Sequence, residues 1–376
     1  MGVPTAPGAA QVVGSLVAEI ETELDALVAR TGDRIREEIP EFRRVPADAL
    51  ASAIRGNVSR ALEALRDLRA PTRHELERAA AVGRERAEQG LGVDAVLHAY
   101  RISISSVWSR FGELAREHGA DVASVLAFSE TLWLWADAVM DIVAEAHREV
   151  ELEQAREEQQ RRDAFVLALL TGTLSAAELR RDSATHGLDG DRAYVPFRAR
   201  GATPRTAAAL AGDGGLAIAL DRDIAGIATR APEAPEGIVC GIGPAAELTD
   251  LPSAFANASR ALQTAVAFGQ QGAFSLADLS IRPAILADAA LGDAFAARYL
   301  EPLENLGRLG VGLDATLRAW FDQEMRVEET ARVLHVHPNT LRHRLRRFEE
   351  ATGATLRDPR VLVELWWALE RRRIAG

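Results

Sequence analysis

The residues best suited to chemistry in this 376-residue chain gather in a short stretch near its C-terminal end. Between Asn339 and Phe348 there are four arginines and no acidic residue, together with Thr340 and His343. Arginine can pair bidentately with guanine and asparagine with adenine, while further arginine and threonine side chains can hold phosphate. These residue types therefore predict contact with DNA rather than catalysis.

Their spacing places these side chains on one face of a helix expected over residues 338–350. Leu341, Leu345 and Phe348 follow the i, i+4, i+7 pattern of a buried stripe, with Arg344 nearer its edge. At 100° per residue, the outer face and the turn before the helix carry the predicted DNA-contacting residues: His337, Asn339, Thr340, Arg342, His343, Arg346 and Arg347.

The elements before this helix have the pattern of a helix-turn-helix. A short helix is expected over Glu328–Leu334, where the small side chain of Ala331 permits close crossing by the next helix. His335 begins the turn at a position that often needs a positive φ, and Pro338 suits the first helical position. An earlier helix presents an apolar face formed by Leu317, Trp320 and Phe321. The simpler alternative is a solvated basic helix in an arginine-rich chain.

Charge is distributed unevenly along the chain. Residues 325–376 hold 11 Arg against 7 Asp and Glu, a local net of +4 in a chain of net charge −11, which indicates a polyanionic partner at that end. Arg371–Arg373 could contact phosphate or simply be solvated. The single cysteine, Cys240, excludes an internal disulfide or a cysteine-built metal site. With no signal-peptide pattern and no apolar run of 18 residues, we expect a cytoplasmic protein without a membrane segment.

Periodicity divides the chain into a tail and three parts. Residues 1–10 predict a disordered tail, and residues 11–155 an all-α domain whose connector helix continues to about 170, with a break near Glu153 as the alternative. Short β-type runs indicate an α/β domain over 160–285. Residues 286–376 are helical again and include the helix-turn-helix at 314–373. The expected fold class is multidomain α and α+β.

Three stretches of the sequence also resemble a known class of regulators. TARVLHVHPNTLRHRLRRFEEATG resembles the C-terminal helix-turn-helix of PucR/CdaR-class bacterial transcription regulators. RRDAFVLALLTG, ATHGLDGDRAYVPFRA and IVCGIGPAAELTDLPSAFANASRALQTA resemble the middle domain of that class, a degenerate relative of GGDEF cyclase domains. GVDAVLHAYRISISSVWSRF is similar to the N-terminal sensory domain of RsbR-type co-antagonists, which implies a globin-like helical fold. The resemblance implies transcription control by a sensed signal.

The cyclase resemblance does not extend to an active site. The hairpin at residues 221–226 reads Asp-Arg-Asp-Ile-Ala-Gly and lacks the adjacent acids that would hold Mg²⁺ beside a triphosphate. The turn at residues 241–244, Gly-Ile-Gly-Pro, lacks the third glycine of a dinucleotide fingerprint. We therefore predict a non-enzyme with no catalytic residue, metal or cofactor, and a nucleotide-metabolising enzyme is the weaker alternative.

The N-terminal part offers candidates for sensing. His98 could ligate haem in a globin-like fold, but a bonded or exposed helix histidine is the simpler interpretation. Tyr100, Arg101 and Trp108 are the candidate effector-binding residues, with ordinary core packing as the alternative. Trp133 and Trp135 could line the same pocket.

Together these patterns predict a signal-responsive, DNA-binding transcriptional regulator. The principal alternative is an interaction protein whose N-terminal domain drives assembly. Because one helix-turn-helix buries little surface on DNA, a homodimer is expected. Its contact is expected along the connector helix, through an apolar stripe formed by Val139, Ile142, Val143, Ala146 and Val150.

Overall fold

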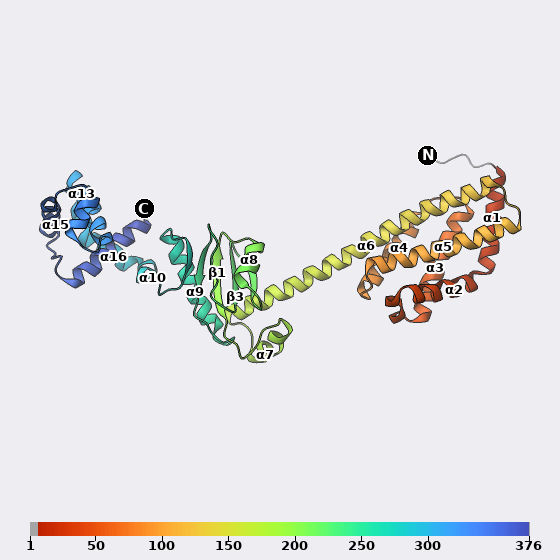
Figure 1. Cartoon of the computed structure of the whole chain (residues 1–376), viewed down its shortest axis with the longest axis horizontal. Coiled ribbons are helices and arrows are strands. Elements are labelled where there is room, and N and C mark those ends of the chain that lie inside the picture. The colour runs from red at the N-terminus through yellow and green to blue at the C-terminus, as the bar shows by residue number, and fades with distance from the viewer. Residues whose placement is uncertain (1–6, 376) are drawn as a thin grey trace. The chain divides into compact units, whose positions relative to one another are not determined.

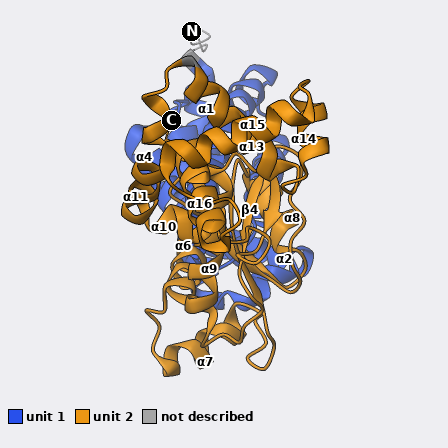
Figure 2. Cartoon of the chain, turned by 90° about the vertical axis from the view of Figure 1, so that its left-hand side faces the viewer, with its two compact units in different colours: residues 1–159 blue, residues 160–376 orange. Residues whose placement is uncertain are grey.

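The computed structural model describes the backbone of residues 7–375 and the side chains of residues 8–307 and 309–375. The chain divides into two compact units, residues 1–159 and 160–376 (Figure 2). Helix α1 begins at Pro7, so the expected tail over residues 1–10 is wrong for residues 7–10, and its first six residues lie outside the described part of the chain.

Unit 1 is a bundle of helices packed along one another (Figure 1). Its elements are α1 (Pro7–Thr22), α2 (Leu24–Glu38), the 3-10 helix η1 (Pro40–Arg44), α3 (Ala47–Arg66), α4 (Arg73–Glu88), α5 (Val93–Glu117) and the first part of α6 (Val122–Thr171). One continuous core runs through them, with Phe111 and Phe128 stacked at its centre. The all-α character expected of this region is what the structure has.

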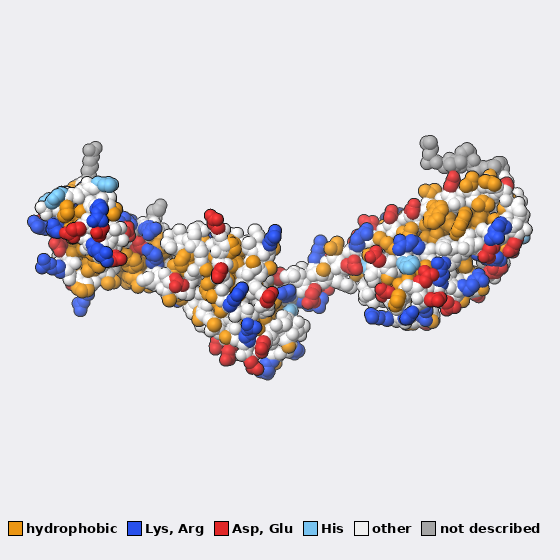
Figure 3. Space-filling model, in the orientation of Figure 1, with side chains coloured by type: hydrophobic (Ala, Val, Ile, Leu, Met, Phe, Trp, Pro, Cys, Tyr) orange, Lys and Arg blue, Asp and Glu red, His pale blue; other side chains and the backbone are white. Residues whose placement is uncertain are grey.

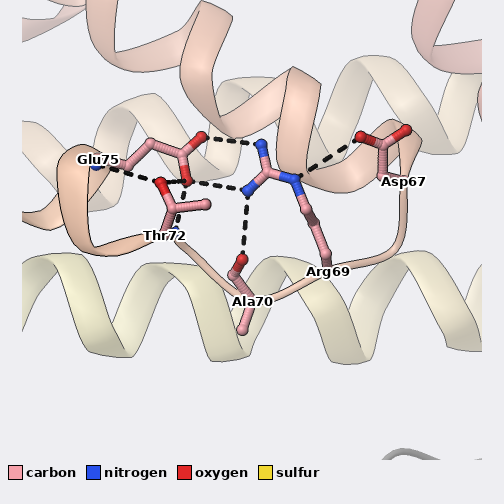
Figure 4. A network of polar contacts seen from close by, with 5 residues as sticks. All are labelled: Asp67, Arg69, Ala70, Thr72 and Glu75. Atoms are coloured by element: carbon pink, nitrogen blue, oxygen red, sulfur yellow. Dashed lines mark hydrogen bonds and ion pairs between the residues drawn. The ribbon is translucent and has the colours of Figure 1, made fainter.

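A polar network fixes the turn between α3 and α4 (Figure 4). Arg69 donates to both carboxylate oxygens of Glu75, at 2.9 and 3.0 Å. Glu75 also accepts from the backbone N–H of Thr72, whose hydroxyl accepts from the Glu75 N–H to complete a capping box. These bonds to the charged form hold the pKa of Glu75 down at about 2, although its side chain is almost fully buried.

Helix α6 is unbroken from Val122 to Thr171, so the alternative of a break near Glu153 is wrong. Its inner side belongs to the unit 1 core, and the backbone of Val143 approaches α4 so closely that a Cβ at Gly83 would lie 2.6 Å from the Val143 carbonyl oxygen. Val139, Val143 and Ala146 are therefore buried within their own unit, and the dimer contact expected along this stripe is wrong.

The same helix meets the length and composition criteria for a membrane span. Its most apolar 18-residue window has a mean hydropathy of 1.3, and 39% of that window is buried. Since the core helix of a bundle passes the same test, this single helix is weak support for a span.

Unit 2 begins with the end of α6 and contains a small mixed sheet. Its strands are β1 (Val195–Arg200), β2 (Leu216–Leu220), β3 (Asp223–Ala228), β4 (Val239–Ile242) and β5 (Gly272–Phe274), in the order β2-β3-β1-β4-β5. All neighbours are antiparallel except β4 and β5. Because the strand pairs are mostly antiparallel, this domain is α+β rather than the expected α/β. The four longer strands lie where β-type runs were expected, and β5 was not foreseen.

Helices α7 (Ala176–Thr185), α8 (Pro204–Ala211) and α9 (Leu251–Ala267) accompany the sheet, and α9 packs on β4 and β1 (Figure 1). This packing explains the glycines of the turn at residues 241–244. A Cβ at Gly241 would lie 2.0 Å from the Ala258 carbonyl oxygen, and one at Gly243 would lie 2.2 Å from that of Ala254. The two glycines thus let α9 approach the strand.

The C-terminal part of unit 2 is helical throughout. It contains α10 (Arg282–Ala287), α11 (Ala289–Tyr299), α12 (Glu301–Glu304), α13 (Arg308–Asp322), α14 (Val327–Val333), α15 (Pro338–Thr352) and α16 (Pro359–Ala375). Their shared core centres on Tyr299, Leu317, Phe348 and Leu365. The architecture as a whole is mostly helical with one small mixed sheet, as multidomain α and α+β implies.

Candidate nucleic-acid interface

Helices α14 and α15 and the turn between them form the helix-turn-helix. After Val333 the chain leaves the helix through His335, whose φ of 51° lies in the left-handed region. The Val336 N–H closes the turn on the Ala331 carbonyl at 3.0 Å. His337 then caps α15, its Nδ1 accepting from the Asn339 N–H at 3.2 Å, and Pro338 is the first helical residue.

The inner side of α15 is fixed by apolar contacts. Leu341 and Phe348 are fully buried and Leu345 is half-buried in the same stripe. Ala331 of α14 is buried beneath them, so its small side chain allows the two helices to cross closely. Arg344 lies at the edge, where its Nη1 donates to the Thr316 hydroxyl of α13 at 3.1 Å. This arginine therefore has a structural role.

The outer side of α15 and its N-cap residue carry the seven predicted DNA-contacting residues. Six of them are exposed and Arg347 is half-exposed: His337, Asn339, Thr340, Arg342, His343, Arg346 and Arg347. Basic and histidine side chains are visible on this part of the surface (Figure 3). The structure thus brings the seven together on one accessible face, and their contact with DNA stays a prediction.

Internal ion pairs distinguish these arginines from one another. Arg342 pairs with Glu328 of α14 at 2.7 Å and also donates to Asn339 at 3.2 Å. Arg347 pairs with Glu350 at 2.7 Å. Within the described residues, neither Arg346 nor His343 has a hydrogen-bond or ion-pair partner. All donors of the Arg346 guanidinium are therefore available to an incoming ligand. Arg342 and Arg347 must first break their ion pairs with Glu328 and Glu350.

The arginines at the end of α16 serve the fold. Arg371 pairs with Asp293, Arg372 with Glu304 and Arg373 with Glu370. Each of the three is therefore already paired with an acid of α11, α12 or α16, so simple solvation does not describe them, and their contact with phosphate stays a prediction.

The hairpin considered for cyclase chemistry has its own ion cluster. Asp223, at the start of β3, is 4% exposed and accepts from Arg198 and Arg200, both at 2.9 Å. A carboxylate neutralised by two guanidinium groups is a poor ligand for Mg²⁺, because displacing either group would leave a charge unpaired. Asp221 is exposed in the turn.

The sensory candidates do not share one place. Tyr100 is buried and lines a cavity in unit 1, whereas Arg101 is exposed and Trp108 packs against Phe111 and Phe128. Trp135 is buried in the core, while Trp133 is exposed. His98 is partly exposed on α5 with its Nε2 3.5 Å from Glu38. Of these residues, Tyr100 lines a cavity formed by η1 and α2–α5.

Two family models match the chain. Residues 313–370 match the PucR C-terminal helix-turn-helix domain, and residues 25–162 match the RsbT co-antagonist protein rsbRD N-terminal domain. Residues 313–370 are thus similar to the PucR-type helix-turn-helix domain. The PucR-type match contains α14, the turn and α15 entirely, and the rsbRD-type match covers most of unit 1.

Relatives of known sequence are similar over parts of the chain. The purine catabolism regulatory protein of Bacillus subtilis is 30% identical over 130 residues, 34% of this chain and 24% of that protein. An uncharacterized protein of Mycobacterium tuberculosis is 40% identical over 74 residues, 19% of this chain and 18% of that one. The chain thus covers only a small part of these relatives' own length.

One solved structure is also similar. The crystal structure of a regulator of polyketide synthase expression from Bifidobacterium adolescentis aligns over 56% of this chain and 91% of that one, at 20% identity. The TM-score of this alignment is 0.25.

Sequence reasoning missed the acids that hold the outer arginines. The i, i+3 spacing of Arg347 and Glu350 on one helix could have signalled their pair. No local signal connects Arg342 with Glu328, since the two are brought together only when α14 crosses α15.

Proposed function

We propose that this chain is a cytoplasmic, signal-responsive transcriptional regulator that recognises double-stranded DNA with α15. The observation that supports the proposal is that this helix has two different faces. One is buried through Leu341 and Phe348, and the other is exposed and basic. A helix with these two faces, after a tight turn and a short helix, can enter the major groove. Asn339 and His343 would contact base edges, and Arg342 and Arg347 would contact phosphates.

The direct test is selection of genomic fragments by the purified protein, followed by anisotropy titrations on the selected sequence. Asn339→Ala and His343→Ala should each weaken binding by about 1–3 kcal/mol and relax specificity at one position. The proposal would be contradicted if the protein captured DNA fragments without sequence preference and with an affinity that does not change with salt. That result would favour the alternative, an interaction protein whose helix α15 binds another protein.

We further propose that the regulator is a homodimer and that the exposed face of α6 forms the contact. Val122, Leu126, Trp133 and Leu134 are all at least half exposed, and Figure 3 shows hydrophobic side chains gathered on this part of unit 1. An exposed apolar surface of this kind commonly marks an interface. The two helix-turn-helix domains of such a dimer would bind DNA half-sites about 10 bp apart, or a multiple of that distance.

Light scattering on the full chain tests the dimer. The wild type should be dimeric, and the double variant Trp133→Glu, Leu134→Glu should be a monomer that still folds. Leu152→Glu is the matched control, because Leu152 is exposed on the same helix outside the apolar cluster. A monomeric wild type at tens of micromolar, roughly the range where weak dimers form, would reject the interface. Flotation of the chain with lipid vesicles would assign the face to a membrane instead.

The middle domain is proposed to be a degenerate GGDEF-like module without catalytic activity. Asp223 supports this because both arginines beside it already satisfy its charge. Purified protein with GTP and Mg²⁺ or Mn²⁺ should give no cyclic dinucleotide. Product above a no-protein control would overturn this part of the proposal.

A further inference from the structure

A small cavity lies inside the helical bundle of unit 1. It has a volume of about 40 Å³, is lined by residues of η1 and α2–α5, and is partly open to solvent. Most of its wall is apolar, with Phe42, Leu50 and Val96 among the lining side chains. Four polar side chains also line it, Asn57 from α3, Arg86 from α4, and Tyr100 and Ser103 from α5. The Ser103 hydroxyl is satisfied by the Ala99 carbonyl at 2.9 Å.

The charge in this wall is unusual because it lacks a buried counterion. Arg86 is only 3% exposed, yet its Nη1 donates to the neutral amide of Gln89 at 2.5 Å. The nearest carboxylate, that of Glu85, lies 3.5 Å from Nη1 on the exposed side of α4. Within the described residues, nothing else bonds to this guanidinium. A buried guanidinium is stabilised by an anion with good hydrogen-bond geometry, and the protein itself supplies none inside the cavity.

The polar groups of Asn57 and Tyr100 are also short of partners. The side-chain oxygen of Asn57 is buried and accepts no hydrogen bond. The Tyr100 hydroxyl has no hydrogen bond among the described side chains, and burial raises the pKa of this phenol to about 12 although Arg60 and Arg86 oppose the shift. The hydroxyl is therefore a neutral donor. Buried polar groups without partners are uncommon in folded proteins. The unpartnered Asn57 oxygen and the Tyr100 hydroxyl, beside a buried guanidinium without a buried counterion, point to a ligand.

From these contacts we propose that the cavity binds a small monocarboxylate with a compact apolar body. The carboxylate would pair with Arg86 and accept from the Tyr100 hydroxyl, and the hydrocarbon part would fill the space beside Phe42 and Leu50. Since one water needs roughly 10–15 Å³, the cavity holds about three water-sized groups. A short-chain acid such as propionate has this size.

This inference rests on the sensory role proposed above and names the class of ligand that would be sensed. Its ligand contacts come from α3, α4 and α5, and none lies in the helix-turn-helix. Ligand binding and DNA binding are measured separately, so failure of one leaves the other interpretable.

The test is calorimetric titration of the full-length protein with sodium acetate, propionate and butyrate at constant ionic strength, up to about 50 mM, with thermal shift as a second readout. Propionamide, which has nearly the same shape without the charge, is the ligand control. At least one acid should bind saturably at one site per chain and propionamide should not. Arg86→Met should weaken binding about tenfold or more, because it removes a charge-assisted bond. The matched control Arg84→Met, on the exposed side of the same helix, should bind like the wild type.

Three results would overturn the proposal. These are no saturable binding by any of the three acids, equal binding of propionate and propionamide, and unchanged binding in Arg86→Met. If Arg86→Met does not fold, Tyr100→Phe decides, since it removes only the hydroxyl and should weaken binding severalfold. Full affinity in a folded Tyr100→Phe protein would then count against the site.

Discussion

Replacing Glu75 by Gln tests whether one ion pair fixes the turn between α3 and α4. The substitution keeps the shape of the side chain and removes the charge that Arg69 and the Thr72 N–H bind. Folding lowers the pKa of Glu75 from 4.5 to about 2, and each pKa unit is worth about 1.4 kcal/mol. The charged form thus contributes at most about 3 kcal/mol, or about 2 after discounting for solvent at Arg69, whose side chain is 32% exposed.

The pH dependence of this contribution has a definite sign. A carboxyl group whose pKa is lowered by folding stabilises the folded state above its unfolded pKa of 4.5. That stabilisation is lost as the pH falls from 4.5 toward 2. At pH 3.5 roughly two fifths of it should be gone. The gap between wild type and Glu75→Gln should therefore narrow over this range.

Hydrogen exchange of the α3 and α4 amides in the full-length protein measures the effect locally. Glu75→Gln should lower the opening free energy of this region by about 2–3 kcal/mol at pH 7. The matched control is Glu77→Gln, which removes an exposed charge paired with Arg73 on the same helix and should change it by less than about 0.5 kcal/mol. Equal effects of the two substitutions would refute the reasoning, as would a gap that does not change with pH.

Three further predictions concern unit 2. Glu328→Ala should tighten DNA binding severalfold in anisotropy titrations, because Arg342 no longer has to break an ion pair before it contacts phosphate. The control Glu329→Ala, which frees no residue of the predicted DNA face, should have a smaller effect. Equal affinities for wild type and Glu328→Ala would contradict the pairing. Asp223→Asn should lower the free energy of unfolding of unit 2 by about 2–4 kcal/mol, seen as a shift of the denaturant midpoint, since two arginines lose their counterion; an unshifted midpoint would show that the cluster is dispensable. His335→Gly should increase the free energy of unfolding by about 0.5–1 kcal/mol and raise the melting temperature slightly, because glycine adopts the positive φ without strain. A lower melting temperature would contradict the strain argument.

Local rules explain what could be predicted of the DNA-binding part. The stripe of Leu341, Leu345 and Phe348 follows from helical periodicity alone, and it fixes which residues face outward. The positive φ at His335 and the helix start at Pro338 follow from backbone sterics. Each of these features depends on residues within about one or two helical turns, so a single sequence was sufficient.

Features that depend on distant partners were missed or misassigned. Periodicity showed that the face of α6 with Val139 and Val143 is buried but not what buries it, and α4 at Gly83 covers it rather than a second chain. Strand β5 has three residues at the edge of the sheet, too few for a pattern. The cavity beside Tyr100 depends on Arg86 and Asn57, which come from other helices and have no spacing that joins them.

The salt dependence of binding to a selected DNA fragment tests the central claim most directly. Arg346→Ala, Arg347→Ala should lower the affinity at least tenfold near physiological salt and reduce the slope of log K against log salt by roughly one to two units. The double variant Arg73→Ala, Arg84→Ala removes the same charge from exposed positions of unit 1 and should bind like the wild type. Affinity and slope unchanged in the Arg346, Arg347 variant would contradict the assignment of α15 as the recognition helix.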